Sequence, residues 1–415
     1  MKIMILGAGG QGAPCASILA KDPAVSEIKL CDINGGLLEK VKARIGSPKL
    51  RIETADASDE DGIAAAAAGF DAIVDLVTPA YFEGNMRAAL KAGVHYLNTA
   101  WEEYIYEGFS EHGLRPDARL KYDDAFREKG RTAVLGCGMS SGYATNVVAR
   151  YYVDRLDTVE SIKFRLAKRD TRIPEEEEIL HPWNPGWNPK QALLDFVVPT
   201  YKFENGEFVK MDQVFAEPEI WDFPAPVGRR QVSHHAHEEP FNIPQSFADK
   251  GLKYCDFKYY INKAVAPIVV LGLGSDKARD IGGQSVKPLD VVLSFIPDPG
   301  DAFLNEDPSR FEELDATSAV SIMTEIIGCR NGKKLRYLIH VPTMNVPRKH
   351  MYDTYGTSLI SVALPAAVGV KMAAEGAKKG VIHPQDLDPQ RFVQLMRESG
   401  YRNEWEETVE ELGDA

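Results

Sequence analysis

The sequence predicts an α/β protein, with a doubly wound parallel sheet in its N-terminal part followed by an α+β domain with a mixed sheet. Short apolar runs alternate with Ala-rich helical stretches up to about residue 138. This sequence pattern changes from about residue 158, and alternating apolar runs return after residue 268. Strands that alternate with helices indicate βαβ crossovers, which build parallel sheets.

Five apolar runs in the N-terminal part predict strands that are buried on both faces, because they are almost continuously apolar. These runs are Lys2–Leu6, Ile28–Cys31, Ala72–Val77, Val94–Leu97 and Thr132–Leu135. Helices are expected between them, over Ala13–Lys21, Gly36–Ile45, Glu60–Ala68 and Gly84–Ala92.

The remainder of the chain has a different texture. Many prolines between residues 171 and 245 predict long loops and antiparallel pairs. Strand-like runs are Phe196–Phe203, Ile268–Leu273, Val291–Phe295, Ala319–Cys329 and Leu335–Val341. Residues 357–378 predict a helix of small residues, with Pro365 as a kink or a late first-turn residue, which packs tightly back onto the first domain. The acidic tail from Glu404 is expected to be a solvated helix end.

Composition excludes several classes of protein. The chain has 415 residues and a net charge of −13 with no extended Lys/Arg run, so nucleic acid is not an expected partner. No apolar run reaches the roughly 18 residues that span a bilayer, and no signal peptide pattern follows Lys2. Five scattered cysteines without a C-x-x-C pair fit reduced thiols, so we expect a cytoplasmic protein without a disulfide framework.

The strongest motif is the glycine-rich run after the first strand, which matches G-x-G-x-x-G and opens a helix. In such a turn Gly7 permits the tight bend, Gly9 lets the backbone approach a pyrophosphate, and Gly12 lets helix and strand pack closely. Asp32 lies 20 residues beyond Gly12, where a carboxylate can bind both ribose hydroxyls. The full motif, Gly7, Ala8, Gly9, Gly10, Gln11 and Gly12, is typical of Rossmann domains; an ordinary strand-to-helix turn is the alternative.

Asp32 also predicts NAD rather than NADP as the cofactor, because a carboxylate there repels a 2′-phosphate and no Arg or Lys follows it. Asp56 and Ala57 are candidates to flank the adenine. Thr78 and Pro79 are candidates to lie along the cofactor, with plain loop roles as the alternative for both pairs.

Ligands of open α/β sheets bind beyond the carboxyl ends of the strands. The loops there contribute Asn98, expected near the cofactor, and the run from Gly136 to Gly142, with Gly138 and Ser140 as candidate substrate contacts. The helix expected from Tyr143 presents an N-terminus that can bind a carboxylate or carboxamide. Simple N-capping is the alternative for Ser140 and Ser141.

A second constellation is His234-His235-Ala236-His237-Glu238-Glu239, just after Arg229 and Arg230. A zinc site is conceivable, but adjacent imidazoles rarely share an ion and no Cys-rich segment accompanies them, so no metal is expected. General acid/base work by His235 or His237 suits amine oxidation, which moves a proton as well as a hydride. Arg229 or Arg230 can clamp a carboxylate; solvated surface residues are the alternative for all of them.

Several motifs in order along nearly the whole chain resemble the saccharopine dehydrogenase-like family. They are VHYLNTA (Val94–Ala100), LGCG (Leu135–Gly138) followed by Thr145-Asn146, FENGEF (Phe203–Phe208), WDFP (Trp221–Pro224), HEE (His237–Glu239) and LPAAVGVKMAAEG (Leu364–Gly376). The chain is most similar to the carboxynorspermidine dehydrogenase branch and more distantly to lysine 6-dehydrogenases.

The resemblance implies a Rossmann domain at residues 1–140, completed by C-terminal helices at about 355–400, and a substrate-binding and dimerisation domain at 141–354. It implies nicotinamide-dependent chemistry at a C–N bond of an amino acid or an amine derived from one, in a homodimer. By position, it places Gly138, Tyr143, Asn146 and His237-Glu238-Glu239 along the substrate cleft.

Two departures from the family pattern bear on specificity. Relatives commonly have an acidic residue and Pro-Gly after LGCG, where this chain has Met139-Ser140-Ser141-Gly142, and the polyamine branch usually has a Ser-Arg type strand end where this chain has Asp32. We therefore expect an NAD-dependent oxidoreductase of a cationic amino acid or polyamine-like amine, with Glu238 and Glu239 holding the ammonium. The alternatives are oxidative deamination of lysine's side-chain amine and a non-catalytic NAD-binding regulator.

Overall fold

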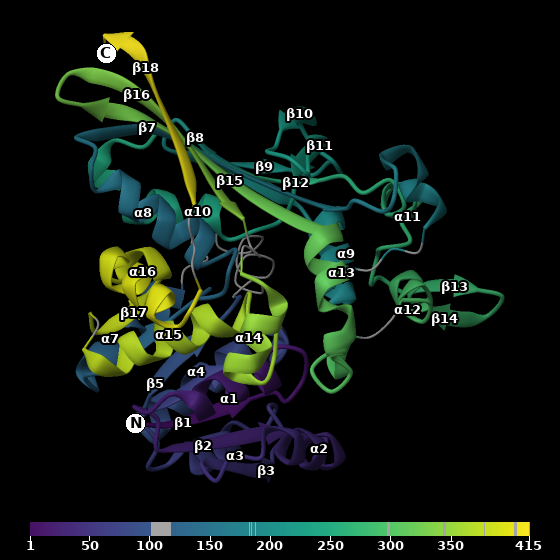
Figure 1. Ribbon diagram of the computed structural model, residues 1–415, viewed down its shortest axis with the longest axis vertical. Coiled ribbons are helices and arrows are strands. Elements are labelled where there is room, and N and C mark those ends of the chain that lie inside the picture. Colours follow the sequence, from purple (N-terminus) through teal and green to yellow (C-terminus); the bar gives the residue numbers. More distant parts are fainter. Residues whose placement is uncertain are drawn as a thin grey trace. The chain divides into compact units, whose positions relative to one another are not determined.

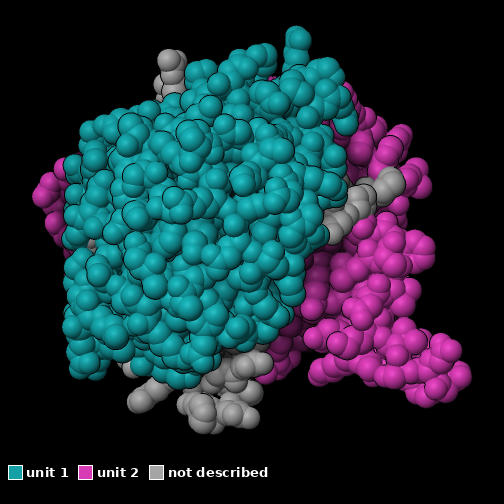
Figure 2. Space-filling view, turned by 90° about the horizontal axis from the view of Figure 1, so that it is seen from below, with its two compact units in different colours: residues 1–155, 301–312, 344–404 teal, residues 156–300, 313–343, 405–415 magenta. Residues whose placement is uncertain are grey.

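The computed structural model describes residues 1–100, 118–181, 183, 185–186, 188–296, 299–342, 346–376, 378–401 and 405–414. The chain divides into two compact, discontinuous units (Figure 2). Unit 1 comprises Met1–Arg155, Asp301–Glu312 and Met344–Glu404, and unit 2 comprises Leu156–Gly300, Glu313–Thr343 and Trp405–Ala415. In this division residues 141–155, 301–312 and 344–354 fall in unit 1, while 405–415 fall in unit 2. The substrate-binding and dimerisation domain expected at 141–354 stays a prediction.

Unit 1 is built on a parallel sheet of seven strands, in the order β17-β6-β5-β4-β1-β2-β3, which confirms the predicted doubly wound fold. The chain reverses direction across the sheet between β1 and β4, which is where such sheets bind ligands. The strands are β1 (Lys2–Leu6), β2 (Glu27–Asp32), β3 (Leu50–Thr54), β4 (Ala72–Asp75), β5 (His95–Asn98), β6 (Thr132–Val134) and β17 (Gly380–Ile382).

Helices follow the strands of unit 1 as expected for βαβ units. They are α1 (Gly12–Lys21), α2 (Gly35–Ile45), α3 (Glu60–Ala67), α4 (Phe82–Ala92), α7 (Ala118–Glu128), α8 (Val148–Val153), α14 (Arg348–Tyr355), α15 (Ala363–Glu375) and α16 (Pro389–Glu398). Short helical turns are η1 (Pro79–Tyr81), η2 (Tyr143–Val147, a π-helical turn), η6 (Pro308–Arg310) and η7 (Pro384–Asp386), while η5 (Pro299–Asp301) lies where the chain passes from unit 2 to unit 1. Asn34 caps α2 by accepting the Leu37 N–H at 3.0 Å.

The late helix α15 packs against α1 and the strands β4, β5 and β6, as its small residues predict (Figure 1). It begins later than expected, so that Pro365 is its third residue and needs no intrahelical hydrogen bond from its nitrogen. Gly369 makes the close approach possible, because a Cβ there would lie 2.4 Å from Cys137 Sγ and 2.9 Å from Leu97 Cδ1. A segment from the far end of the chain thus completes the packing of the parallel sheet.

Unit 2 contains a mixed sheet of nine strands, in which β10-β11-β12-β7-β15-β16-β18 form the main path and β8 and β9 attach to β12. Its strands are β7 (Thr158–Asp170), β8 (Thr200–Glu204), β9 (Glu207–Met211), β10 (Glu219–Asp222), β11 (Arg229–His234), β12 (Tyr254–Tyr260), β15 (Ser318–Arg330), β16 (Lys333–Pro342) and β18 (Glu406–Asp414). A hairpin of β13 (Arg279–Ile281) and β14 (Gln284–Val286) stands apart.

Short helices accompany this mixed sheet. They are η3 (Glu175–Leu180), α9 (Pro189–Val197), α10 (Glu239–Ser246), η4 (Ala248–Lys250), α11 (Ala266–Val270), α12 (Pro288–Leu293) and α13 (Phe311–Thr317). In the part of the chain that the structure describes, no helix is both long and apolar enough to cross a membrane.

Three of the strand predictions for unit 2 are wrong. The run Phe196–Phe203 is divided between α9 and β8, because Asn188 caps α9 and Pro189 opens it. Ile268–Leu273 and Val291–Phe295 overlap α11 and α12, each of which begins at or just before a proline. Each of these helices buries apolar residues along one side only. In the sequence, the spacing of those residues resembles the alternation of apolar and polar residues in a strand.

The acidic tail is also not a helix end. Its residues form β18, which pairs antiparallel with β16, and the two strands run together in Figure 1. Strand β16 is rich in basic residues. Lys333 Nζ lies 2.9 Å from Glu411 Oε2, and Arg336 Nη1 lies 3.3 Å from Glu410 Oε2. Charge complementarity with a distant strand therefore overrides the local helical tendency of the glutamates.

We predict opposite effects of the same Gly→Ala change in two helices of unit 1. Gly369→Ala should destabilise the protein by about 1–3 kcal/mol, because the added methyl overpacks α15 against Cys137 and Leu97. Gly84→Ala in α4 should be neutral or stabilise by up to about 1 kcal/mol, because its Cβ meets only Arg87 Nη2 at 3.7 Å. Urea unfolding measures both, and equal effects would contradict the close approach of α15.

Candidate functional site

The glycine-rich turn between β1 and α1 has the geometry that its sequence predicts. Gly7 has φ +90°, and a Cβ on Gly12 would lie 1.7 Å from the Gly7 carbonyl oxygen. Around Gly9, by contrast, a Cβ would meet nothing within 4 Å. The backbone is therefore tight where helix and strand meet and open at the glycine that a pyrophosphate would approach.

Asp32 at the end of β2 is tied directly to this turn. Its Oδ2 accepts the Ala8 N–H at 2.7 Å and its Oδ1 accepts the Asn34 N–H at 2.8 Å. Gln11 Oε1 is buried in the same turn, without a hydrogen-bond partner in the described part of the chain. The open Gly9, the carboxylate at the strand end and the unsatisfied amide oxygen fit a bound nicotinamide dinucleotide, whose hydroxyls and amide could meet these polar groups.

The other predicted cofactor residues of the first loops lie near the surface. Asp56 is exposed and accepts hydrogen bonds from the Ser58 N–H at 2.8 Å and Oγ at 2.7 Å, and these bonds lower the pKa of Asp56. Ala57 and Pro79 are half-buried, and Thr78 is exposed immediately before η1. Roles for these four residues stay predictions.

A buried polar network under the carboxyl ends of β4 and β5 was not predicted as part of the site. Asp75 Oδ2 accepts hydrogen bonds from the Tyr96 hydroxyl and from Asn85 Nδ2, each at 2.8 Å. Burial raises the pKa of Asp75 to about 6, and the hydrogen bonds from Tyr96, Asn85 and the Val77 N–H limit the rise. The network holds the start of the loop that leads to Thr78, and the lone acid in the apolar run Ala72–Val77 was its signal in the sequence.

Asn98 uses its side chain to hold the loop after β6. Its Oδ1 accepts the Gly136 N–H at 2.9 Å, and its backbone oxygen accepts the Cys137 N–H at 2.8 Å. Gly138 is buried, and a Cβ there would lie 3.2 Å from the Ser141 oxygen, while Ser140 is half-buried. The predicted residues after β5 and β6 thus form one connected loop cluster.

The predicted helix N-terminus at Tyr143 is a buried π-helical turn without a side-chain cap. Asn146 Oδ1 accepts hydrogen bonds from Ser141 Oγ and Gly142 N–H, each at 3.0 Å, and Asn146 Nδ2 donates to Gln385 Oε1 at 2.9 Å. The ring of Tyr143 stacks on Phe392 with centroids 5.6 Å apart. These contacts give both residues a structural task in unit 1, and their substrate role stays a prediction.

In unit 2 the loop between β11 and α10 brings His237, Glu238 and Glu239 together. Nδ1 of His237 lies 3.3 Å from a Glu238 carboxylate oxygen and contacts the Glu239 carboxylate more closely. The imidazole also stacks on Phe257 of β12, with centroids 3.9 Å apart and planes 10° apart. Both glutamates are buried, and the His237 side chain is 12% exposed. We name His237, Glu238 and Glu239 the HEE cluster.

Electrostatics favours the protonated imidazole at His237. Burial alone would lower its pKa, but the carboxylates of Glu239, Glu238 and Asp195 outweigh burial and raise the pKa to about 9. Asp195 lies on α9, where Gln191 Nε2 donates to its Oδ1 at 2.7 Å. Asp195 was missed from the sequence, although a single acid within the apolar stretch of α9 was a signal for it.

His235 has the opposite electrostatics. Burial and the neighbouring charge of His237 hold its pKa well below the usual value, and its ring lies between Phe196 at 4.6 Å and Tyr259 at 5.0 Å. A cavity of about 10 Å³ adjoins it, enough for about one water molecule. His234 points to the other sheet face, where its Nε2 lies 3.0 Å from Glu217 Oε2. Of the predicted pair, His237 is therefore the residue that carries a proton to donate at neutral pH.

The HEE cluster also has the spacing of a metal site, since one ligand atom from each residue lies within 4.8 Å of the others. A metal requires a deprotonated imidazole, whereas the surrounding carboxylates favour the protonated one. This chemistry suits an ion-paired acid better than a metal centre.

The two predicted arginines do not join the HEE cluster. Arg229 is 74% exposed and pairs with Asp222 at 3.2 Å. Arg230 is 3% exposed, and its Nη1 lies 3.1 Å from Glu175 and 3.6 Å from Glu178. Only Arg230 has the burial of a binding residue.

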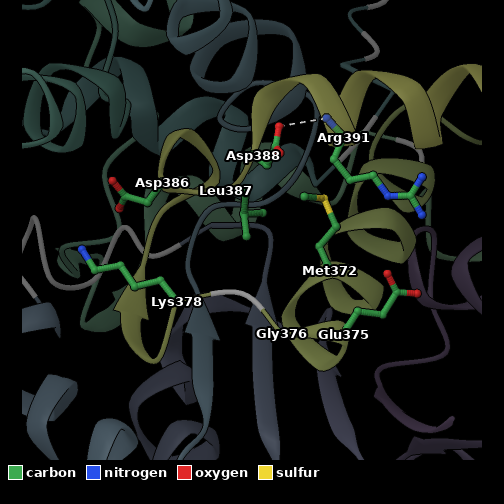
Figure 3. A pocket seen from close by; sticks show the side chains of 8 residues that line it. All are labelled: Met372, Glu375, Gly376, Lys378, Asp386, Leu387, Asp388 and Arg391. Carbon is green, nitrogen blue, oxygen red and sulfur yellow. Dashed lines mark hydrogen bonds between the residues drawn. The ribbon is translucent and has the colours of Figure 1, made fainter.

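Unit 1 also contains a cavity of about 310 Å³ that is lined by none of the predicted site residues. Figure 3 shows Met372 and Leu387 between two groups of charged side chains, at the end of α15 and the start of α16. Its lining residues are Met372, Glu375, Gly376, Lys378, Asp386, Leu387, Asp388 and Arg391.

Comparison with known proteins supports the nucleotide site. Residues 3–134 match the family model of the saccharopine dehydrogenase NADP binding domain. The chain is 25% identical to carboxyaminopropylagmatine dehydrogenase of Synechocystis sp., over 98% of both chains. It is 24% identical to carboxynorspermidine synthase of Vibrio alginolyticus, over 96% of this chain and 95% of the other.

Two solved structures share the fold. Saccharopine dehydrogenase (L-Glu forming) from Saccharomyces cerevisiae superposes with a TM-score of 0.68 at 14% identity, over 99% of both chains. Homospermidine synthase from Legionella pneumophila, in complex with NAD, superposes with a TM-score of 0.60 at 12% identity, over 99% of this chain and 91% of the other. The predicted resemblance is thus confirmed: residues 3–134 match the saccharopine dehydrogenase NADP binding domain, and the whole chain is similar in sequence to these relatives and in fold to saccharopine dehydrogenase.

Proposed function

We propose that the protein is an NAD-dependent oxidoreductase that makes or breaks a C–N bond of an amino acid or a polyamine-like amine. The observation that carries the proposal is the HEE cluster, in which buried carboxylates hold an imidazolium beside an aromatic ring. Carboxylates in such a place favour an ammonium ligand, and the imidazolium supplies a proton donor. The names of the relatives, a dehydrogenase and a synthase of carboxylated amines, support the same class.

In the direction of bond formation, an amine and a carbonyl compound first give a carbinolamine. His237 donates its proton to the departing hydroxyl, so that water leaves and an iminium forms while a carboxylate of Glu238 or Glu239 faces the nitrogen. The glycine-rich turn and Asp32 would hold a reduced nicotinamide dinucleotide, which would supply the hydride that completes the secondary amine. In the reverse direction the neutral His237 takes the proton back from water, so one residue serves both directions.

Two other functions remain as alternatives. Oxidative deamination of lysine needs no carbonyl co-substrate, so NADH formation from lysine and NAD alone would favour it. A non-catalytic regulator would bind NAD without turnover of any amine and imine mixture. NADH consumption that requires both an amine and a 2-oxo acid or amino aldehyde supports the proposed function. The cytoplasmic location and the homodimer expected from the sequence stay predictions.

We predict that Asp32 makes the enzyme prefer NADH to NADPH. Asp32→Ser should weaken NADH binding about tenfold or more, because it removes a charged hydrogen-bond acceptor. It should also reduce the ratio of NADH affinity to NADPH affinity. Fluorescence titration with both cofactors measures the ratio. Asp61→Ser, which changes an exposed acid paired with Lys91, is the matched control. Wild-type protein that binds both cofactors equally would contradict the assignment.

We predict that the reductive activity falls as pH rises through about 9, because His237 must be protonated and its pKa is raised to that value. Glu239→Gln removes the largest source of that rise, so the alkaline limb of kcat/KM should move to lower pH by about 1 unit or more. His237→Asn should lower kcat about 10²–10⁴-fold.

The matched control for this pH profile is Glu217→Gln, which changes the carboxylate paired with His234 on the other sheet face. It should leave the alkaline limb in place. Dialysis against EDTA should also leave activity unchanged. An alkaline limb that is the same in Glu239→Gln as in wild type would remove His237 from the proton transfer.

A further inference from the structure

Arg230 on β11 is a buried cation, and three of its five N–H donors lie on nitrogens without a hydrogen-bond partner in the described part of the chain. Its side chain is 3% exposed, and Nη1 faces the carboxylates of Glu175 and Glu178. Nε and Nη2 are buried and have no hydrogen-bond partner among the residues that the structure describes. Leaving buried donors of a charged group unsatisfied is unfavourable, so native structures normally provide a partner for them.

The two unsatisfied nitrogens form one edge of the guanidinium. Their N–H groups point the same way in the plane of the group, which is the fork that binds a carboxylate through two parallel hydrogen bonds. The neighbouring strand adds a third donor, because Trp221 of β10 lies opposite Arg230 in the antiparallel register. Its Nε1 is also buried, and no described residue provides it with a hydrogen-bond partner. Directly opposed residues have Cβ atoms about 4.5–5.5 Å apart, within reach of a shared small ligand.

The charges around Arg230 distinguish between anions. Glu175 and Glu178 already lie at 3.1 Å and 3.6 Å from Nη1. A dianionic phosphate would be repelled by both acids, whereas a monoanionic carboxylate pays about half that cost. The surroundings of Arg230 therefore favour a carboxylate.

The site is also separate from the HEE cluster. Strand alternation places Arg230, Val232 and His234 on one sheet face, and Val232 pairs with Tyr260. Phe257, on which His237 stacks, is three residues from Tyr260 and so projects from the opposite face. A ligand at Arg230 thus occupies a different place from an ammonium at the HEE cluster.

Access to Arg230 depends on the short turn η3, which carries Glu175 and Glu178. None of the residues of η3 is buried, and Ile179 and Leu180 are 55% and 76% exposed. A segment with so little buried surface can open at low free-energy cost.

We propose that the Nε and Nη2 edge of Arg230, with Trp221 Nε1, binds the carboxylate group of a small molecule at a second site in unit 2.

The test measures propionate binding to the full-length protein by ligand-observed NMR, without NAD. Wild-type protein should bind propionate more tightly than inorganic phosphate. Arg230→Lys keeps the charge beside Glu175 and Glu178 but loses the fork, and should weaken propionate binding at least tenfold. Trp221→Phe keeps the ring and should weaken it several-fold. Arg229→Met, at the exposed neighbouring arginine, is the matched control and should bind as wild type does.

His237→Asn separates this proposal from the proposed function. It should bind propionate as wild type does, and if the protein proves inactive on every amine, binding that depends on Arg230 still stands. Loss of binding in His237→Asn but not in Arg230→Lys would place the anion on the imidazolium and overturn the proposal. Equal binding to wild type and Arg230→Lys, or tighter binding of phosphate than of propionate, would overturn it too. Circular dichroism melts establish that each variant is folded.

Discussion

Glu239 holds the imidazole of His237 against the ring of Phe257, and the chemistry available to unit 2 depends on this buried pairing. An imidazole in an apolar place is normally neutral, because burial penalises its charged form. Here the carboxylates reverse that preference and keep the proton at neutral pH. His235, two residues away, lacks such carboxylates and is held neutral. One short loop therefore presents two histidines in opposite states.

In unit 1, polar side chains at the carboxyl ends of the parallel strands hold the adjoining loops in place. Asp32 accepts a hydrogen bond from the glycine-rich turn, and Asn98 accepts one from the loop after β6. Asp75 accepts one from the Val77 N–H at the start of the loop after β4, and Tyr96 and Asn85 donate to its other oxygen. Each polar side chain sits where a strand ends, so the backbone that would face a cofactor is oriented before any ligand arrives.

The parallel sheet could be predicted because its signals are local. Each buried strand is a short apolar run, and Gly7, Gly12 and Asp32 lie at spacings that one βαβ unit dictates. Unit 2 was harder to predict, since α11 and α12 bury one stripe of apolar residues that also fits a strand. The acidic tail illustrates the same limit, because its strand exists only through pairing with the basic strand β16.

The candidate site also has a part that could be predicted from the sequence and a part that could not. The sequence by itself determined the nucleotide turn, the acid at the end of β2 and the grouping of His237 with Glu238 and Glu239, because neighbours in the chain stay neighbours in space. Only the tertiary structure decided that Phe257 and Asp195 complete this cluster and that Trp221 lies opposite Arg230. Strand register and helix packing set those contacts between distant segments, and with them the burial that determines which histidine carries the proton.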